Sequence, residues 1–153
     1  AMQVAAMSPI ALNAASVPQD VKDTETKNAV EKAKQNQIAK AVEAALKKAG
    51  INPAHVDSED HIESNTAKGW ITPEDAAKAR EIKATVAQEA EANLKEQMIQ
   101  NIANGMVAKF YKESCLLEQA YIDDNKISVA QYLQNIDKEL TVTDFKRFTL
   151  RAE

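Results

Sequence analysis

The chain has 153 residues, of which 44% are hydrophobic, and a formal net charge of −4 from 19 basic and 23 acidic side chains. This mild acidity argues against nucleic acid as a direct partner, because phosphate binding needs clustered lysine and arginine. No apolar run approaches the roughly eighteen residues of a membrane span, and one cysteine cannot build a disulfide framework or a four-ligand zinc site within the chain.

The N-terminal segment predicts a short helix followed by a short strand. Ala1–Met7 reads as the last turns of a helix that ends at Ser8, because Pro9 disfavours helical geometry in the residue before it. Ile10–Leu12 has the composition of a strand. Ala1–Ala15 is apolar but lacks the charged start of a signal peptide, so we expect a protein of the reducing cytoplasm.

A long amphipathic helix is predicted over Val21–Ala49. Pro18 fits its first turn, where the missing N–H costs little. Small and aliphatic residues recur at three and four positions, and the other positions are mostly Lys, Glu, Gln and Asn. Gly50 should end the helix in a left-handed conformation, and Pro53 should prevent it from resuming.

The segment Ile51–Ile71 is polar and acidic but carries several aliphatic residues and the single tryptophan. Asn52 and Ser58 could each begin a turn of helix. Thr72 should cap a second long helix that starts at Pro73 and ends near Asn93, or runs on to Ile102. Two long helices joined by a compact tip predict an antiparallel hairpin of coiled-coil type.

The densest apolar stretch is Lys109–Ile122, with the sequence KFYKESCLLEQAYI. Spacing over residues 110–117 fits the buried face of a helix, and Ala120–Ile122 could form a strand. A charged turn at residues 123–126, a helix over Ile127–Leu133 and a final strand over Val142–Leu150 should follow.

This stretch closely resembles the signature of bacterial elongation factor Ts. The resemblance rests on Lys109–Glu113, Leu116–Gln119 and Tyr121–Ile122, although family members usually have a proline where this chain has Ala120. It resumes at Ala1–Met7 and covers about half of the chain in these two blocks. A chain that opens inside a family helix is expected to be a piece of a longer protein.

The resemblance implies an α+β fold, mostly α, in which a small antiparallel sheet and its helices carry a protruding helical hairpin. Residues 1–20 and 95–153 would form the C-terminal part of the family's core, and residues 21–94 an inserted arm. The implied partner is the GTPase elongation factor Tu, whose GDP release the family promotes without making or breaking a covalent bond. No cofactor is implied, and a homodimer is left open.

Three residues are candidates for binding a partner. The resemblance places Gln3 near the GTPase, at a position where many family members have a histidine, and Met7 belongs to the same resembling segment. Trp70, just before a helix cap, is either a binding anchor or a pin that holds the tip onto the arm.

Other motifs have simpler interpretations. His55 and His61 flank acidic residues, but a solvated loop explains them better than a metal site. Thr143–Phe145 repeats a family motif that belongs to a region outside this chain, and we take it as coincidence. Cys115 should be a buried, unreactive thiol.

A second hypothesis comes from another functional class. The hairpin alone could be an adaptor or self-association module without any role in nucleotide exchange. An enzyme is the least supported class, because no glycine-rich phosphate loop and no Ser/His/Asp or Cys/His set is present.

Overall fold

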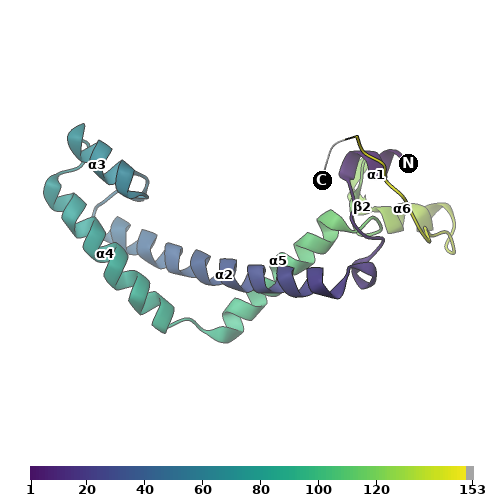
Figure 1. The fold of residues 1–153 in the computed structure, drawn as a ribbon, viewed down its shortest axis with the longest axis horizontal. Helices are drawn as coiled ribbons and strands as arrows, with labels where there is room; N and C mark the ends of the chain where they lie inside the picture. Colours follow the sequence, from purple (N-terminus) through teal and green to yellow (C-terminus); the bar gives the residue numbers. More distant parts are fainter. Residues whose placement is uncertain (151–153) are drawn as a thin grey trace. The chain divides into compact units, whose positions relative to one another are not determined.

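Residues 1–150 are described by the computed structural model of the chain. In this range the predicted class is confirmed, since six helices accompany one small antiparallel sheet (Figure 1). The elements are α1 (Met2–Met7), α2 (Gln19–Lys48), α3 (Glu59–Ala67), α4 (Pro73–Ala92), α5 (Glu96–Ser114), β1 (Ala120–Tyr121), β2 (Asp124–Ser128) and α6 (Val129–Ile136), with 3₁₀ turns at Ala14–Ser16 and Pro53–His55.

The chain divides into two compact units, and the boundaries fall inside helices. Unit 1 consists of Ala1–Ala29 together with the chain from Ile102 onward, and unit 2 is Val30–Asn101. Helices α2 and α5 each contribute residues to both units. The division into a core subdomain and an arm at residues 20/21 and 94/95 stays a prediction about the family's domain organisation.

In unit 1, the segment after α1 pairs with the end of α5. Ala11 and Cys115 form a parallel bridge, and the Leu116 N–H donates to the Ala11 carbonyl at 2.9 Å. The predicted strand at Ile10–Leu12 is thus reduced to one bridge. Cys115, Ala11 and Val17 are buried, and half-buried side chains of Val21, Phe110 and Tyr111 pack around them.

The same pairing corrects the predicted helix over residues 110–117. Helix α5 ends at Ser114, because the amides of Leu116 and Leu117 donate to Ala11 and Leu12 instead of to the preceding helical turn. Leu117 therefore does not lie on a helix. The apolar density of this stretch still contributes to unit 1, but the buried cluster around it is small.

Two further boundaries differ from the predictions. Residues 124–126 belong to strand β2 rather than to a turn, because β2 pairs with β1 through Tyr121–Asp124 and Ala120–Ser128, with an irregular register between them. Ser128 then caps α6 in a reciprocal capping box with Gln131, so that helix begins and ends later than predicted.

The predicted final strand over Val142–Leu150 is wrong within the described residues. This segment is extended but pairs with no other strand. Its alternation of side chains buries no face, and Phe148 is 92% exposed. Strand-like composition without a paired edge gives an extended chain and not a sheet.

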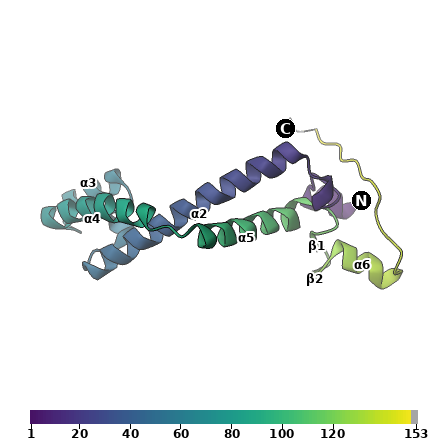
Figure 2. The same cartoon turned by 90° about the horizontal axis from the view of Figure 1, so that it is seen from below.

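Unit 2 contains an antiparallel hairpin made by the second half of α2 and by α4 (Figure 1). Gly50, with φ +79°, ends α2 as predicted. The Ile51 N–H donates to Leu46 and the Gly50 N–H to Lys47, which is the Schellman arrangement. Of the two alternatives for the second long helix, the earlier end is right, because residues 93–95 separate α4 from α5 (Figure 2).

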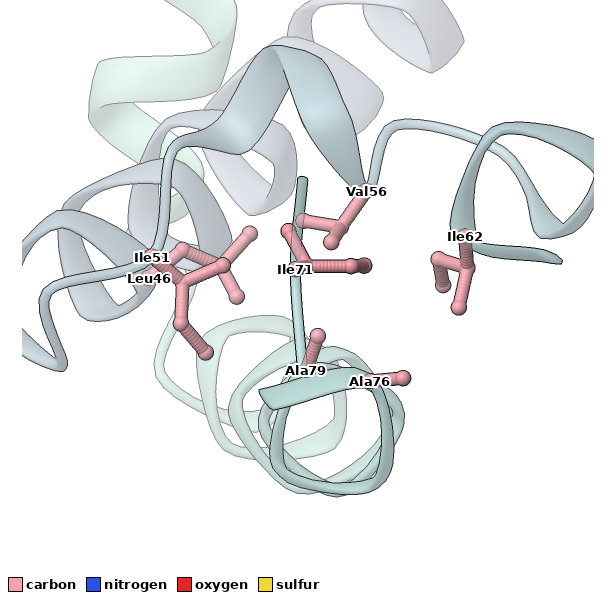
Figure 3. Packing of buried hydrophobic residues seen from close by; sticks show 7 residues of the cluster. All are labelled: Leu46, Ile51, Val56, Ile62, Ile71, Ala76 and Ala79. Carbon is pink, nitrogen blue, oxygen red and sulfur yellow. The ribbon is translucent and has the colours of Figure 1, made fainter. Parts of the chain in front are cut away.

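The largest buried cluster of the described chain lies at the tip of this hairpin and not in the signature stretch. Figure 3 shows aliphatic side chains from α2, α3, α4 and the turns between them meeting in one cluster: Leu46, Ile51, Val56, Ile62, Ile71, Ala76 and Ala79. The predicted caps Asn52, Ser58 and Thr72 are all present. The tip is therefore a folded structure with its own core.

Candidate functional site

Helix α1 presents an apolar outward side in unit 1. Met2 is 72% exposed and Met7 is 42% exposed, and Ile10 follows them with 57% exposure. The helix ends at Ser8, whose φ of 46° is left-handed and lets the Ser8 N–H donate to the Val4 carbonyl. Exposed apolar groups in neighbouring positions are typical of a surface that binds another protein.

Gln3 points to the other side of α1 and is buried. Its Nε2 donates to the Ala120 carbonyl at 2.9 Å, and its Oε1 accepts from the Ile122 N–H at 3.0 Å. Gln3 thus joins α1 to both residues that flank Tyr121. Because only 9% of Gln3 is exposed, a partner would meet its neighbours on α1 first.

Gln119 extends this connection and is fully buried. Its Nε2 donates to the Met7 carbonyl at 3.1 Å and to the Glu113 carbonyl at 2.8 Å, while its Oε1 accepts from Gln3 at 3.4 Å. We call Gln3 and Gln119 the amide relay. Both ends of the six-residue α1 are held by it, and so short a helix is not stable by itself.

An open groove of about 690 Å³ lies beside this helix in unit 1. Its walls come from α1, from β1, from α6 and from the extended segment over residues 142–149. Tyr121 and Tyr132 stack in its lining with ring centroids 4.0 Å apart. Hydrogen bonds to Tyr132 and to Asp123 raise the pKa of Tyr121 above its ordinary value.

Cys115 is buried, as predicted. Burial, with a smaller contribution from Glu118, raises the pKa of the Cys115 thiol to about 11. The thiol therefore stays protonated at neutral pH, and a protonated thiol is a poor nucleophile.

At the tip of unit 2, Trp70 is 63% exposed and does not belong to the buried cluster. The Trp70 ring lies 5.8 Å from the ring of His55, and the Lys68 ammonium lies 5.1 Å from the indole centroid. These contacts stay within the tip, so the proposed pin onto the helices of the arm has no support.

The other motifs acquire structural roles. His61 pairs through Nδ1 with Asp57 at the surface, and this contact lowers the pKa of the Asp57 carboxyl. Across residues 1–150 no group of three or more His, Cys, Asp or Glu side chains could hold a metal ion. Phe145, from the Thr143–Phe145 triplet, lines the groove as a half-buried side chain.

The comparison with protein families decides what this arrangement belongs to. A family described as "Elongation factor TS" matches residues 1–152. The chain belongs to the elongation factor Ts family. It is therefore related to factors of translation elongation, and the resemblance in the signature stretch is confirmed.

Curated elongation factor Ts proteins are similar to this chain along its whole length. The protein of Bacteroides fragilis is 65% identical and that of Phocaeicola vulgatus 61% identical over 153 residues. The similarity to the protein of Porphyromonas gingivalis, 46% identity, covers 63 residues, or 41% of this chain. No solved structure matches.

The chain spans about half the length of these relatives, namely 46% of the Bacteroides fragilis protein. Nothing in the geometry tests whether Gln3, Met7 and Trp70 bind a partner, so their roles stay proposals. No helix within residues 1–150 combines the length and the apolar character that crossing a bilayer requires.

The amide relay is the feature that sequence reasoning missed. Gln119 was part of the family signature, yet its side chain carried no predicted role. The available signal was a polar residue between apolar Leu116–Leu117 and Tyr121–Ile122, since a buried amide must find hydrogen-bond partners.

Proposed function

We propose that this chain is part of a guanine-nucleotide exchange factor that binds elongation factor Tu and promotes GDP release during translation elongation. The observation that carries the proposal is the family match over residues 1–152. The proposed action is binding alone, without covalent chemistry and without a cofactor, and it takes place in the cytoplasm.

In this proposal the docking surface in unit 1 is the outward side of α1. Met2 and Met7 offer flexible apolar side chains, which suit binding to another protein. Gln3 supports this surface indirectly, because its hydrogen bonds to residues 120 and 122 fix the orientation of α1. Trp70, the third candidate residue, lies on unit 2 and is not part of this docking surface.

Exchange requires a factor that prefers the empty GTPase over the GDP-bound one. Binding and GDP affinity are then linked, so that each weakens the other by the same factor. A surface that binds both forms equally shifts no equilibrium between them. The family resemblance assigns the residues that disturb the nucleotide to regions outside this chain, so we expect the chain to anchor the GTPase and to accelerate GDP release only slightly.

The test compares this chain with the full-length factor of the same organism. Release of a fluorescent GDP analogue from purified elongation factor Tu should be fast with the full-length factor and nearly basal with the chain alone. Binding, measured by titration calorimetry, should be weak and similar with and without GDP. Strong acceleration by the chain alone would contradict the anchoring role.

The exposed indole of Trp70 favours one alternative, the helical-hairpin adaptor. Met7→Asp should weaken binding to elongation factor Tu if unit 1 docks on it, whereas Trp70→Ala should leave that binding nearly unchanged. If only Trp70→Ala abolishes binding to any partner, or if the folded chain does not bind elongation factor Tu, the adaptor explains the protein better. Self-association, including a homodimer, would appear in sedimentation velocity of the same samples.

A further inference from the structure

The tip, defined as Ile51–Thr72, has a buried interior and polar contacts to α4 that fix the position of its surface. Its interior contains Ile51, Val56, Ile62 and Ile71, each no more than 8% exposed. Arg80 of α4 pairs with Glu59 at the start of α3, and the Lys83 ammonium donates to the Val56 carbonyl at 2.7 Å. These contacts fix α3 and its flanking turns on α4.

Trp70 is presented by this framework. Gly69, with φ +72°, ends α3, and the Trp70 N–H donates to the Asn65 carbonyl at 2.9 Å. The Asn65 side chain is 7% exposed and donates to the His55 carbonyl at 2.9 Å. Asn65 thus holds both the backbone of Trp70 and the turn that carries His55, so the exposed indole has a defined position.

An indole in this setting fits a binding anchor. Tryptophan is enriched among the residues that dominate binding energy, because it buries a large area and loses little conformational freedom. No hydrogen bond of the indole N–H is formed with any residue of the described range, so this donor is available to a partner. Fixing the ring in advance lowers the entropic cost of binding.

The charge around the ring selects the kind of partner. Residues 51–83, which are the tip and the part of α4 that packs on it, contain seven carboxylate side chains and four basic ones, and one of the carboxylates, Glu59, is paired with Arg80. The net excess of negative charge disfavours the phosphates of nucleic acids and of anionic membranes. It attracts basic groups.

We propose that Trp70, supported by His55 and Lys68, is the anchor of a docking surface for a protein that offers an apolar pocket rimmed by basic side chains. Carboxylates of α3, including Asp60 and Glu63, would face the basic rim. This surface belongs to unit 2 and does not depend on the proposed docking of α1, so each can fail without the other.

The test uses the fact that Trp70 is the single tryptophan of the chain. Its fluorescence reports on this surface and on no other. The whole chain is titrated with a short amphipathic peptide of lysine and leucine, and the same peptide with glutamate in place of lysine is the matched probe. Poly-uridylate and phosphatidylserine vesicles are the other two probes.

The emission of Trp70 should shift to shorter wavelength with the lysine–leucine peptide, since the indole leaves water. The variant Asp60→Asn/Glu63→Gln should bind this peptide roughly twofold to fivefold more weakly for each carboxylate removed, as exposed ion pairs do. Glu139→Gln, at an exposed position of unit 1, is the control and should bind like the parent chain.

A labelled lysine–leucine peptide then measures the affinity of Trp70→Ala, which should fall at least tenfold. Trp70 lies outside the buried cluster, so this variant should keep the helical circular dichroism of the parent chain. Unchanged affinity of Trp70→Ala overturns the proposal. The proposal is also overturned if no probe shifts the emission of Trp70. It is overturned as well if the glutamate peptide, poly-uridylate or the vesicles shift the emission more than the lysine–leucine peptide does.

Discussion

Replacing Gln119 with leucine tests whether the amide relay holds α1 in place. The substitution keeps roughly the size of the side chain and removes its amide. The Met7 and Glu113 carbonyls lose their donor, and the Gln3 amide loses one acceptor. Every one of these groups takes part in positioning α1 against unit 1.

The expected loss of stability follows from the number of partners left behind. A neutral hydrogen bond contributes about 1 kcal/mol net, and a buried partner left unsatisfied costs about 1–3 kcal/mol. Residues Met7 and Glu113 are exposed, so water can replace part of the loss at their carbonyls. The apolar leucine also returns some burial energy. We expect unit 1 to be destabilised by about 2–3 kcal/mol.

The measurement has to report on unit 1. Amide hydrogen exchange of Ile122, whose N–H donates to Gln3, reports on it directly. The exchange of this amide should speed up by roughly 30-fold to 150-fold in Gln119→Leu, which corresponds to the expected free energy. Gln97→Leu makes the same chemical change at an exposed position of α5 and is the control. Equal exchange of the Ile122 amide in the two variants would refute the relay.

Four further predictions concern packing, thiol chemistry, backbone geometry and the independent folding of unit 1. Phe110→Ala should lower the free energy of unfolding, measured with urea, by about 2–3 kcal/mol. This is less than the loss expected for a fully buried aromatic, because the Phe110 ring is half-buried. A loss no larger than that of Phe148→Ala, at an exposed ring, would contradict this. Cys115 should react with iodoacetamide only after denaturant is added. Since the pKa of the folded thiol is raised to about 11, stability should fall as the pH rises from the ordinary thiol pKa towards that value, and a flat pH profile would count against the burial effect. Gly50→Ala should destabilise unit 2 by about 1 kcal/mol, because the backbone φ of Gly50 is +79°. Gly105→Ala, inside α5 with open space around it, should instead stabilise the protein by about 0.5–1 kcal/mol. Thermal melts in which both variants shift stability in the same direction would contradict this geometry. Joining residue 29 to residue 102 through a short glycine–serine loop should leave unit 1 folded, and loss of its cooperative urea transition would show that unit 2 is required.

Local signals in the sequence were sufficient for the helices of unit 2. Gly50 has no side chain to hinder a left-handed cap, and Thr72 caps α4 as predicted, in a reciprocal capping box with Asp75. These features depend on residues a few positions apart, so they could be placed without knowing the rest of the fold.

Elements that depend on distant partners could not be placed in this way. The end of α5 is decided by backbone pairing with Ala11, more than a hundred residues earlier in the chain. The fate of residues 142–150 depends on whether another strand offers an edge, which composition does not reveal. The buried cluster at the tip was not predicted for the same reason, because Ile51, Ile62 and Ile71 meet only when the turns between α2, α3 and α4 bring them together.

The candidate site shows the same limit. The family resemblance indicated Gln3 and Met7, but it did not distinguish a side chain that faces a partner from one that faces the interior. The structure separates them, since Met7 is 42% exposed and Gln3 is 9% exposed. Gln119 could not be assigned a role from sequence because its partners lie six and more than a hundred positions away.

The amide relay also has a consequence for the response of this surface to acidification. Gln3 and Gln119 carry no ionisable group, so the hydrogen bonds between α1 and the chain around Tyr121 do not change with proton concentration. A histidine at position 3 would gain charge near pH 6.5 and would then have only donors to offer. The Ile122 N–H would lose its acceptor in that state. With glutamine at position 3, the hydrogen bonds that hold α1 to the chain around Tyr121 contain no group that titrates in this range.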